Sequence, residues 1–262
     1  MDKQLEGRVQ SVDRAMLLLE VLSTSDRGLR LTDLSREAGL SLTTVHRLLT
    51  TLEQRHFVQF LTTDNRWHVG QQAFSVGAAF VNDRSFVAPA SPYLRRLRDQ
   101  TRETANLGVV DNGEIVLIDR MDSREITRSL SRVGGRTPMT ASGMGKAFLA
   151  SYSPEDVHSL VKRYGMRKVT SKTLTCRDAL HSQLIQVRRD GYAVDDEEYV
   201  LGLRCVAAPV YDSHAEVACA ISISGLPSRM PSDRIPILGR LVAEAAADMT
   251  RAIGGVIAET LQ

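Results

Sequence analysis

The sequence predicts an α+β protein in which an N-terminal winged helix-turn-helix domain precedes a C-terminal α/β domain. Two observations support this prediction. In the first 70 residues, three segments with apolar residues at helical spacing precede two short alternating segments. From residue 104 onwards, strand-like apolar runs are interspersed with helical segments. We expect a first domain over residues 1–70, linker helices over 71–103 and a second domain over 104–262.

The composition is that of a globular protein without a strong overall charge. The chain has 262 residues, 43% of them apolar, which is enough for two modest domains. Lys and Arg number 33 against 31 Asp and Glu, so any cationic surface must be local. Residues 8–68 are rich in Arg and His, whereas "DDEEY" at 195–199 is acidic. This distribution fits a DNA-reading module joined to another domain.

Cysteine usage and hydropathy favour a cytoplasmic protein. The three cysteines, at 176, 205 and 219, form no CxxC pair, so neither a disulfide framework nor a zinc site is expected. The first residues, "MDKQLEGRVQ", lack the pattern of an export signal. No apolar run approaches the roughly 20 residues that span a bilayer, so no membrane partner is expected.

Three helices are predicted in the first domain. Residues 11–24, "SVDRAMLLLEVLST", begin with a serine near the N-cap position and form the first helix. Its expected buried stripe consists of Val12, Met16, Leu19 and Leu22. A short second helix is expected to start with Thr32 as its N-cap and to end at Gly39. Ser41 is then expected to cap a third helix that runs to about Arg55.

The third helix has an unusual polar face. Its buried stripe is formed by Val45, Leu48, Leu49 and Leu52. The opposite face carries short hydroxyls and one guanidinium, where Lys and Glu would be usual on a solvated helix: Thr43, Thr44, Arg47, Thr50 and Thr51. Small hydroxyl side chains let a backbone approach a duplex closely, and an arginine can bind guanine or phosphate. The alternative is a threonine-rich, solvent-facing helix of an all-helical domain.

A hairpin after the third helix favours the DNA-binding alternative. In "FVQFLTTDNRWHVG", apolar and polar residues alternate on both sides of "TTDN". Helices followed by such a wing form the fold whose third helix enters a major groove. We therefore predict DNA contacts from Ser41, Thr43, Thr44, Arg47, Thr50 and Arg66. Thr63 and Asn65 near the hairpin tip are expected beside the sugar-phosphate backbone, and weaker phosphate candidates are Arg14 and Arg30.

For the second domain, the sequence predicts strands and helices, including one strand that carries small residues on one face. A hairpin turn at Asp111–Gly113 joins two apolar runs, and a long helix closes the chain from residue 232. In "VACAISISG", period two places one set of residues in the core: Val217, Cys219, Ile221 and Ile223. The other face carries Ala218, Ala220, Ser222 and Ser224. Adjacent serines suit a carboxylate or carbonyl oxygen, and the amides of "SGMG" suit an anion. Alternatively, the serines bind a neighbouring backbone or water.

Several segments together resemble the IclR family of bacterial transcriptional regulators over essentially the full length. These segments are "SVDRAMLLLEVL", "LTDLSREAGLSLTTVHRLLTTLEQRHFV", "PMTASGMGKAFLA", "GYAVDDEEYVLGLRCVAAPVYD" and "AISISG". In the pattern of residues along the sequence, the chain looks closest to the allantoin-utilisation repressors of that family, which sense glyoxylate. The resemblance implies a winged helix-turn-helix DNA-binding domain, a GAF-like α/β effector-binding domain, and assembly into dimers or tetramers.

The resemblance also implies a set of effector contacts. These are the backbone amides of Gly143 and Met144 and the side chains of Asp195, Cys205, Ser222 and Ser224. On the residues alone, Cys205 could be an inert buried thiol and Asp195 a solvated acid. Ile126 and Leu203 suit an apolar pocket wall, whereas Ser129 and Thr137 are smaller than the family pattern. A C4 semialdehyde or hydroxy acid, or an aromatic acid, therefore remains an alternative to glyoxylate.

Other chemistries lack their required residues. "TASGMGKA" is not a phosphate-binding loop, because Thr140 replaces its first glycine and Ala147 its Ser or Thr. The chain has no GxSxG and no HExxH motif. A thiol enzyme using Cys205 is the alternative of another class, but no nearby histidine could generate the thiolate. We expect a repressor rather than an enzyme, without cofactor or metal, that binds double-stranded operator DNA and a small oxo-acid or aldehyde.

Overall fold

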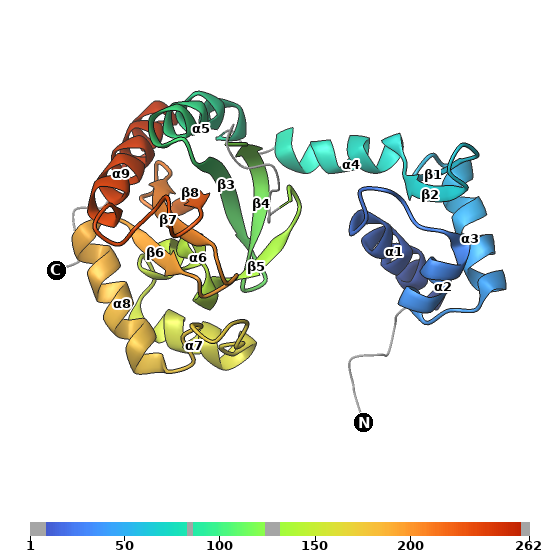
Figure 1. The fold of residues 1–262 in the computed structure, drawn as a ribbon, viewed down its shortest axis with the longest axis horizontal. Helices are drawn as coiled ribbons and strands as arrows, with labels where there is room; N and C mark the ends of the chain where they lie inside the picture. Colours follow the sequence, from blue (N-terminus) through green and yellow to red (C-terminus); the bar gives the residue numbers. More distant parts are fainter. Residues whose placement is uncertain (1–8, 83–85, 124–131, 258–262) are drawn as a thin grey trace. The chain divides into compact units, whose positions relative to one another are not determined.

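The computed structural model describes residues 9–82, 86–123 and 132–257. The chain divides into two compact units, Met1–Asp83 and Arg84–Gln262 (Figure 1). Each unit has its own hydrophobic core. Within the described residues, no helix is both long and apolar enough to cross a membrane.

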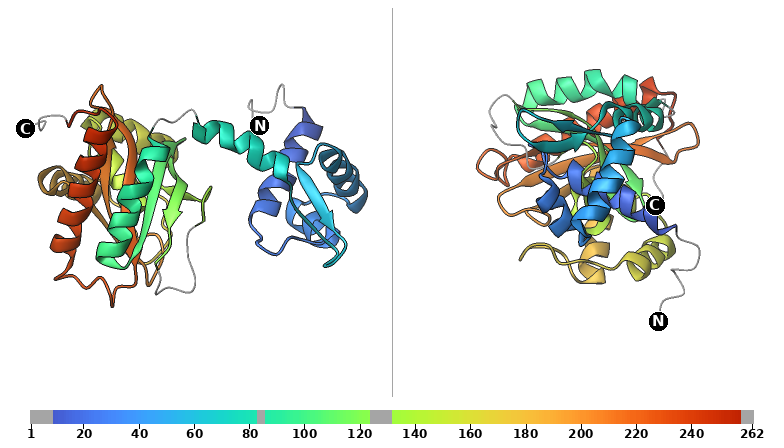
Figure 2. Two further views of the ribbon diagram at one scale, coloured as in Figure 1. Left: turned by 90° about the horizontal axis from the view of Figure 1, so that it is seen from above. Right: turned by 90° about the vertical axis from the view of Figure 1, so that its right-hand side faces the viewer.

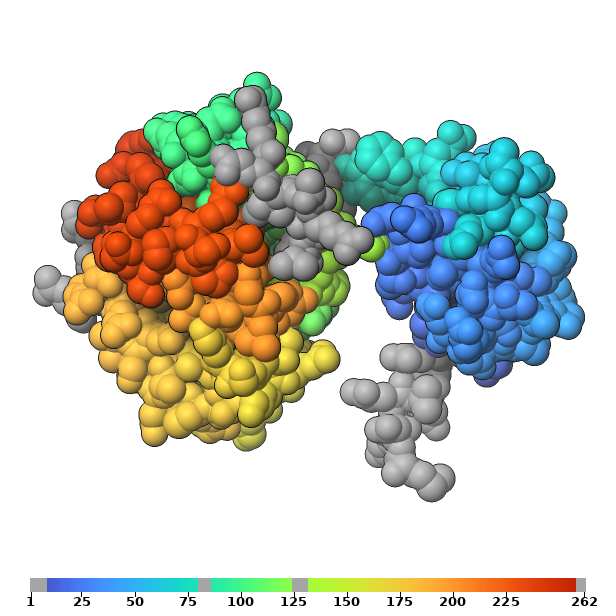
Figure 3. Space-filling view, in the orientation of Figure 1, coloured from blue at the N-terminus to red at the C-terminus, as the bar shows by residue number. Residues whose placement is uncertain are grey.

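The first unit is a winged helix-turn-helix domain, as predicted. Its helices are α1 (Gln10–Ser23), α2 (Leu31–Ala38), α3 (Leu42–Gln54) and α4 (Gln71–Asn82), and its antiparallel hairpin is β1 (Val58–Leu61) with β2 (Arg66–Val69). The apolar stripes of α1, α2 and α3 meet the hairpin in one core, formed by Leu18, Leu22, Leu34, Val45, Leu49, Leu52, Val58 and Trp67. This packing leaves Thr43, Arg47 and Thr51 of α3 exposed. Figure 3 shows a space-filling view of the structure, coloured by residue number.

The turn between α2 and α3 follows the predicted capping residues. Gly39 ends α2 in the left-handed conformation with φ 65°, and the Leu40 amide donates to the Ser35 carbonyl at 3.1 Å. Ser41 begins α3, and its hydroxyl accepts from the Thr44 amide at 3.2 Å. The prediction for Thr32 is wrong, because α2 already begins at Leu31 without a side-chain cap.

The predicted buried stripe of α1 is partly wrong. Val12 and Met16 are 55% and 46% exposed, whereas Leu18 and Leu22 are fully buried. The run "MLLLEVL" presents apolar side chains in every direction, so periodicity cannot select one face. Contacts with α2 and α3 select the face that contains Leu18 and Leu22.

The second unit contains a six-stranded antiparallel sheet with the order β5-β4-β3-β8-β7-β6. The strands are β3 (Thr104–Asp111), β4 (Glu114–Met121), β5 (Arg136–Pro138), β6 (Ala193–Asp196), β7 (Arg204–Tyr211) and β8 (Val217–Gly225). The strand β8 is central and joins two strands that are far apart in the sequence, β3 and β7.

Helices cover both faces of this sheet (Figure 2). One face packs against α5 (Val87–Thr101) and α9 (Ile235–Ala252). The other face packs against α6 (Gly143–Leu149), α7 (Pro154–Tyr164) and α8 (Arg177–Asp190), with the short 3-10 helix Met139–Ala141 preceding α6. This layered α/β arrangement agrees with the predicted fold class.

The predicted alternation of β8 holds over most of the strand. Cys219, Ile221 and Ile223 lie in the core beneath α5 and α9. Val217 does not share their face and packs against the core on the α6 side instead. The register between β7 and β8 shifts near Val210 and Tyr211, so strict period two fails at this end of the strand.

Candidate functional site

The exposed face of α3 carries two side chains that are available for a partner. Thr43 and Arg47 lie one helical turn apart and are both exposed. Within the part of the first unit that the structure describes, neither side chain has a hydrogen-bond or ion-pair partner. This face therefore offers a hydroxyl and an unpaired guanidinium at the spacing that a groove-binding helix uses.

The other hydroxyls of α3 are bonded to their own helix. Ser41 Oγ and Thr44 Oγ1 are 2.9 Å apart, and Thr50 Oγ1 donates to the His46 carbonyl at 2.9 Å. Thr51 Oγ1 likewise donates to a carbonyl of the preceding turn at 3.0 Å. Because their hydrogens are engaged, Thr50 and Thr51 can present only their oxygens as acceptors to a partner.

The hairpin and the start of α2 form a groove beside α3. It has a volume of about 600 Å³ and is lined by residues that include Arg30, Thr50 and Asn65. Arg66 is anchored nearby, because its Nη1 donates to the Gly28 carbonyl at 2.9 Å. The structure thus brings Thr50 together with hairpin residues, while Arg66 also has a structural role that the sequence did not indicate. Arg14 is not among the groove residues.

In the second unit, the sheet register brings the predicted effector-binding side chains together. Cys205 on β7 is paired with Asp195 on β6 and, on its other side, with Ser224 on β8. Ser222 lies two residues before Ser224 and therefore on the same face. Directly opposed residues have Cβ atoms about 5 Å apart. Four predicted side chains from three strands therefore form one polar cluster on the α6 side of the sheet.

The start of α6 lies over this cluster. A Cβ atom on Gly143 would lie 3.3 Å from Cys205 Sγ, so only a small residue fits at that position without displacing the thiol. The Ser142 hydroxyl accepts from the Gly145 amide at 3.1 Å. The backbone amides of Gly143 and Met144, which lie between Ser142 and Gly145, are in the first helical turn, where amides have no intrahelical partner. The Met144 side chain itself is buried, 8% exposed.

One residue of the cluster was not predicted from the sequence. Asn106 on β3 is directly paired with Ser222, and its Nδ2 donates to Ser222 Oγ at 3.3 Å and to Ser224 Oγ at 3.1 Å. Asn106 is only 4% exposed. The available signal was a single amide side chain within the largely apolar run "TANLGVV".

A buried ion pair beside the cluster was also missed. The ammonium of Lys146 on α6 is fully buried and contacts the Glu198 carboxylate, and it donates to Gln183 Oε1 at 2.6 Å. Glu198 lies in the "DDEEY" segment, and its amide donates to Asp195 Oδ1 at 2.7 Å. A lysine within an apolar helix was the signal, but the sequence could not identify its partner.

The environment of the cluster disfavours charged forms of its acidic groups. Burial raises the pKa of Asp195 to about 7, although the Glu198 amide and the Lys146 ammonium oppose this shift. Burial and the neighbouring Asp195 raise the pKa of the Cys205 thiol to about 12. Cys205 keeps some exposed surface as a residue, but its thiol lies in dry surroundings. A nucleophilic cysteine needs a lowered pKa, so this environment argues against a thiol enzyme.

The raised pKa of Asp195 predicts a pH-dependent stability. Between its ordinary value of 3.8 and about 7, folded Asp195 binds more protons than unfolded Asp195, so this group lowers the free energy of unfolding as pH rises. Asp195→Asn keeps the acceptor for the Glu198 amide but removes the titration. Thermal melting should show the variant gaining stability over the wild type from pH 4 to 7, with a constant difference above pH 7. A difference that is independent of pH would contradict the account.

The predicted wall residues are only partly placed. Leu203 is half-buried in the loop before β7, and Thr137 is half-buried on β5, at the opposite edge of the sheet from β6. Ile126 and Ser129 lie outside the described residues.

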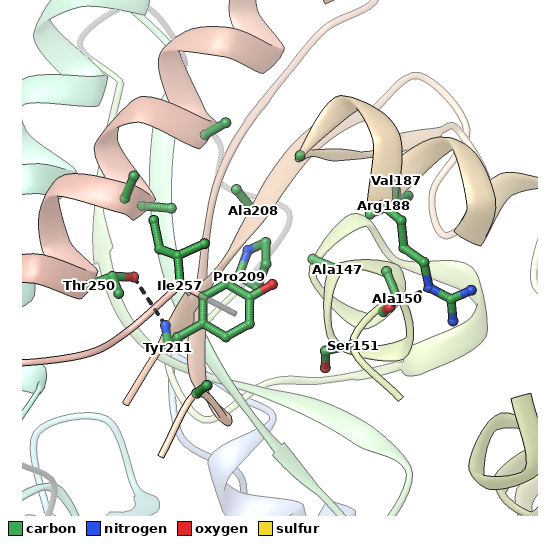
Figure 4. Close-up of a pocket in the computed structure, with 15 residues that line it drawn as sticks. Ala147, Ala150, Ser151, Val187, Arg188, Ala208, Pro209, Tyr211, Thr250 and Ile257 are labelled. Carbon is green, nitrogen blue, oxygen red and sulfur yellow. Dashed lines mark hydrogen bonds between the residues drawn. The ribbon is translucent and has the colours of Figure 1, made fainter. Parts of the chain in front are cut away.

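A separate apolar cavity lies at the other end of α6 and β7 (Figure 4). It has a volume of about 340 Å³, and seven of its fifteen lining residues are alanines, with Arg188 and the Tyr211 ring among its larger residues. The Arg188 guanidinium is bonded to the carbonyls of Ala150 and Tyr152 at 2.7 and 3.0 Å. None of the predicted effector contacts lines this cavity, so it is distinct from the polar cluster.

A winged helix-turn-helix unit joined to an α/β unit with a buried polar cluster is typical of ligand-responsive transcriptional regulators. Comparison with known families agrees with this class. The IclR helix-turn-helix domain matches residues 11–61, and the C-terminal domain of bacterial transcriptional regulator IclR matches residues 78–251. The chain therefore belongs to the IclR family of bacterial transcriptional regulators, as the sequence resemblance predicted.

Relatives match nearly the whole chain. The acetate operon repressor of Salmonella typhimurium is 43% identical over 95% of this chain and 92% of its own length. The transcriptional repressor AllR of Escherichia coli is 36% identical over 94% and 90%, respectively. Both relatives are named as repressors, and neither name denotes an enzyme. The crystal structure of Thermotoga maritima IclR matches with a TM-score of 0.78 at 24% identity, covering 94% of this chain and all of that one, which supports the fold.

Proposed function

We propose that this protein is a repressor that binds its operator through α3 and the hairpin and responds to a small oxo-acid or aldehyde, such as glyoxylate, at the polar cluster of the second unit. The observation that supports the effector site best is the convergence of Asp195, Cys205, Ser222 and Ser224 beneath the Gly143 backbone. The acetate operon repressor and AllR, which match nearly the whole chain, are named repressors, and this favours repression over activation.

The dimensions of the cluster favour a small effector. Gly143 is close enough to Cys205 that an added Cβ would already be in tight contact with the thiol. A C2 or C3 acid fits such a site better than an aromatic acid. The identity to AllR is lower than to the acetate operon repressor, so the relatives do not single out the allantoin repressors. The proposal that glyoxylate is the effector therefore rests on the size of the site and on its hydrogen-bond donors.

The mechanism we propose is a shift between two states of the regulator. An effector changes operator affinity only if it binds the DNA-competent and DNA-incompetent states with different affinities. Closure around Asp195 and Ser224 would favour one of these states. We also propose that the chain acts in the cytoplasm as a dimer or tetramer, because paired recognition helices match the two half-sites of an operator.

Removing the two serine hydroxyls tests this proposal. The double variant Ser222→Ala, Ser224→Ala should bind a duplex, selected from random sequences by the wild type, within about twofold of wild-type affinity. The glyoxylate concentration that changes operator binding should rise by about tenfold or more, because the hydrogen bond that Ser224 donates to a charged ligand is lost. Fluorescence anisotropy of the labelled duplex measures both quantities.

The matched control is Ser182→Ala, which removes an exposed hydroxyl that is bonded only to the Asp178 carbonyl within α8. This variant should respond to glyoxylate like the wild type. An unchanged glyoxylate response in the double variant would contradict the proposed site.

A further inference from the structure

The cluster contains a buried acceptor that has no hydrogen-bond partner in the part of the chain that the structure describes. Asn106 Nδ2 donates to both serine hydroxyls, whereas Asn106 Oδ1 is shielded from water and has no hydrogen-bond partner among the described residues. Buried carbonyl oxygens are nearly always paired, and an unpaired one weakens the state that contains it. A ligand that supplies a donor to this oxygen would remove that penalty.

The two serines of the cluster offer a ligand a donor rather than an acceptor. The oxygens of Ser222 and Ser224 already accept from Asn106. Ser222 also hydrogen-bonds with the Cys205 thiol, whereas the less buried Ser224 keeps its hydroxyl hydrogen for a ligand. The ammonium of Lys146, which lies beside the cluster, is bonded to Glu198 and Gln183. Because this ammonium is already paired, we expect hydrogen-bonding groups, and not a free cation, to select the ligand.

We infer that Asn106 is a specificity-determining residue that selects effectors carrying a hydroxyl donor next to their carboxylate, namely 2-hydroxy acids and the hydrates of aldehydic 2-oxo acids. This inference rests on the proposed function, because it assigns the ligand class of the same site. The carboxylate accepts from Ser224, and the hydroxyl donates to Asn106 Oδ1. Glyoxylate meets the requirement as its hydrate, which carries two hydroxyls. Acetate and the keto form of pyruvate supply no donor.

Binding of four small acids to the purified full chain tests the inference. Isothermal titration should show glycolate and hydrated glyoxylate binding about tenfold more tightly than acetate and pyruvate, respectively, since the weaker ligands leave the buried acceptor unpaired. Asn106→Leu has a similar volume but no acceptor, and it should reduce each preference to within about twofold. Ser224→Ala is the matched control, which should weaken all four acids and retain the preferences.

The outcomes separate this inference from the proposed function. If the wild type binds acetate or pyruvate as tightly as its hydroxylated counterpart, or if folded Asn106→Leu retains the wild-type preferences, the selection by Asn106 is refuted while the effector site stands. If none of the four acids binds the wild type, the small-acid effector site itself is refuted, and the role of Asn106 with it. The wild-type comparison alone decides the matter if Asn106→Leu does not fold.

Discussion

Replacing Lys146 with methionine is expected to destabilise the second unit by about 3–5 kcal/mol. Lys146 is fully buried, and the side chain of its partner Glu198 is only 4% exposed. Removing the ammonium leaves a buried carboxylate whose Oε2 already has no partner among the described residues. Denaturant unfolding of the wild type and the variant measures the loss, and the transition of the second unit should move to lower denaturant.

A second substitution distinguishes two causes of the lost stability, the unpaired buried charge of Glu198 and the lost packing of the lysine side chain. Adding Glu198→Leu to Lys146→Met removes the unpaired carboxylate, so most of the lost stability should return. Lys172→Met is the matched control at an exposed pair, since Lys172 contacts Glu197 on the surface and its side chain is 44% exposed. That control should leave the unfolding transition nearly unchanged. Wild-type stability in Lys146→Met would show that the buried pair contributes nothing.

Replacing Arg47 with alanine is expected to weaken operator binding by about 1–3 kcal/mol, or roughly 5- to 150-fold. The Arg47 side chain is exposed on α3 and makes no hydrogen bond or ion pair within the described part of its unit, so its removal should leave the fold intact. Anisotropy titrations with the selected duplex measure the affinity. Effector binding to the second unit should remain within about twofold of the wild type.

Salt dependence shows what Arg47 contacts. If Arg47 binds phosphate, the slope of log affinity against log salt concentration should fall by about one, whereas a base contact leaves most of the slope in place. Arg189→Ala is the matched control, because Arg189 is an exposed arginine of the second unit, paired with Asp190 and outside the predicted interface. The α3 assignment fails if Arg47→Ala binds the duplex like the wild type.

Local features of the fold could be predicted from the sequence. Gly39 and Ser41 mark the helix ends because capping depends on residues within one turn. The face of α1 could not be predicted, because Val12 and Met16 are as apolar as Leu18 and Leu22 and only tertiary packing separates them.

The candidate effector site shows the same limit. Family resemblance named Cys205 and Ser224, but their assembly depends on a strand register that a single sequence does not contain. Asn106 reaches the serines from a strand more than one hundred residues away, so its contact with them could be seen only in the fold. The partner of Lys146 was hidden for the same reason, because Glu198 is one acid among four consecutive ones.

Photo-crosslinking from α3 tests the central claim most directly. Benzoylphenylalanine placed at Thr43 should crosslink to the selected duplex on irradiation, and excess unlabelled duplex should suppress the product. The same probe placed at Tyr164, an exposed residue of the second unit, should give little product. If position 164 crosslinks efficiently and position 43 does not, α3 is not the helix that reads DNA.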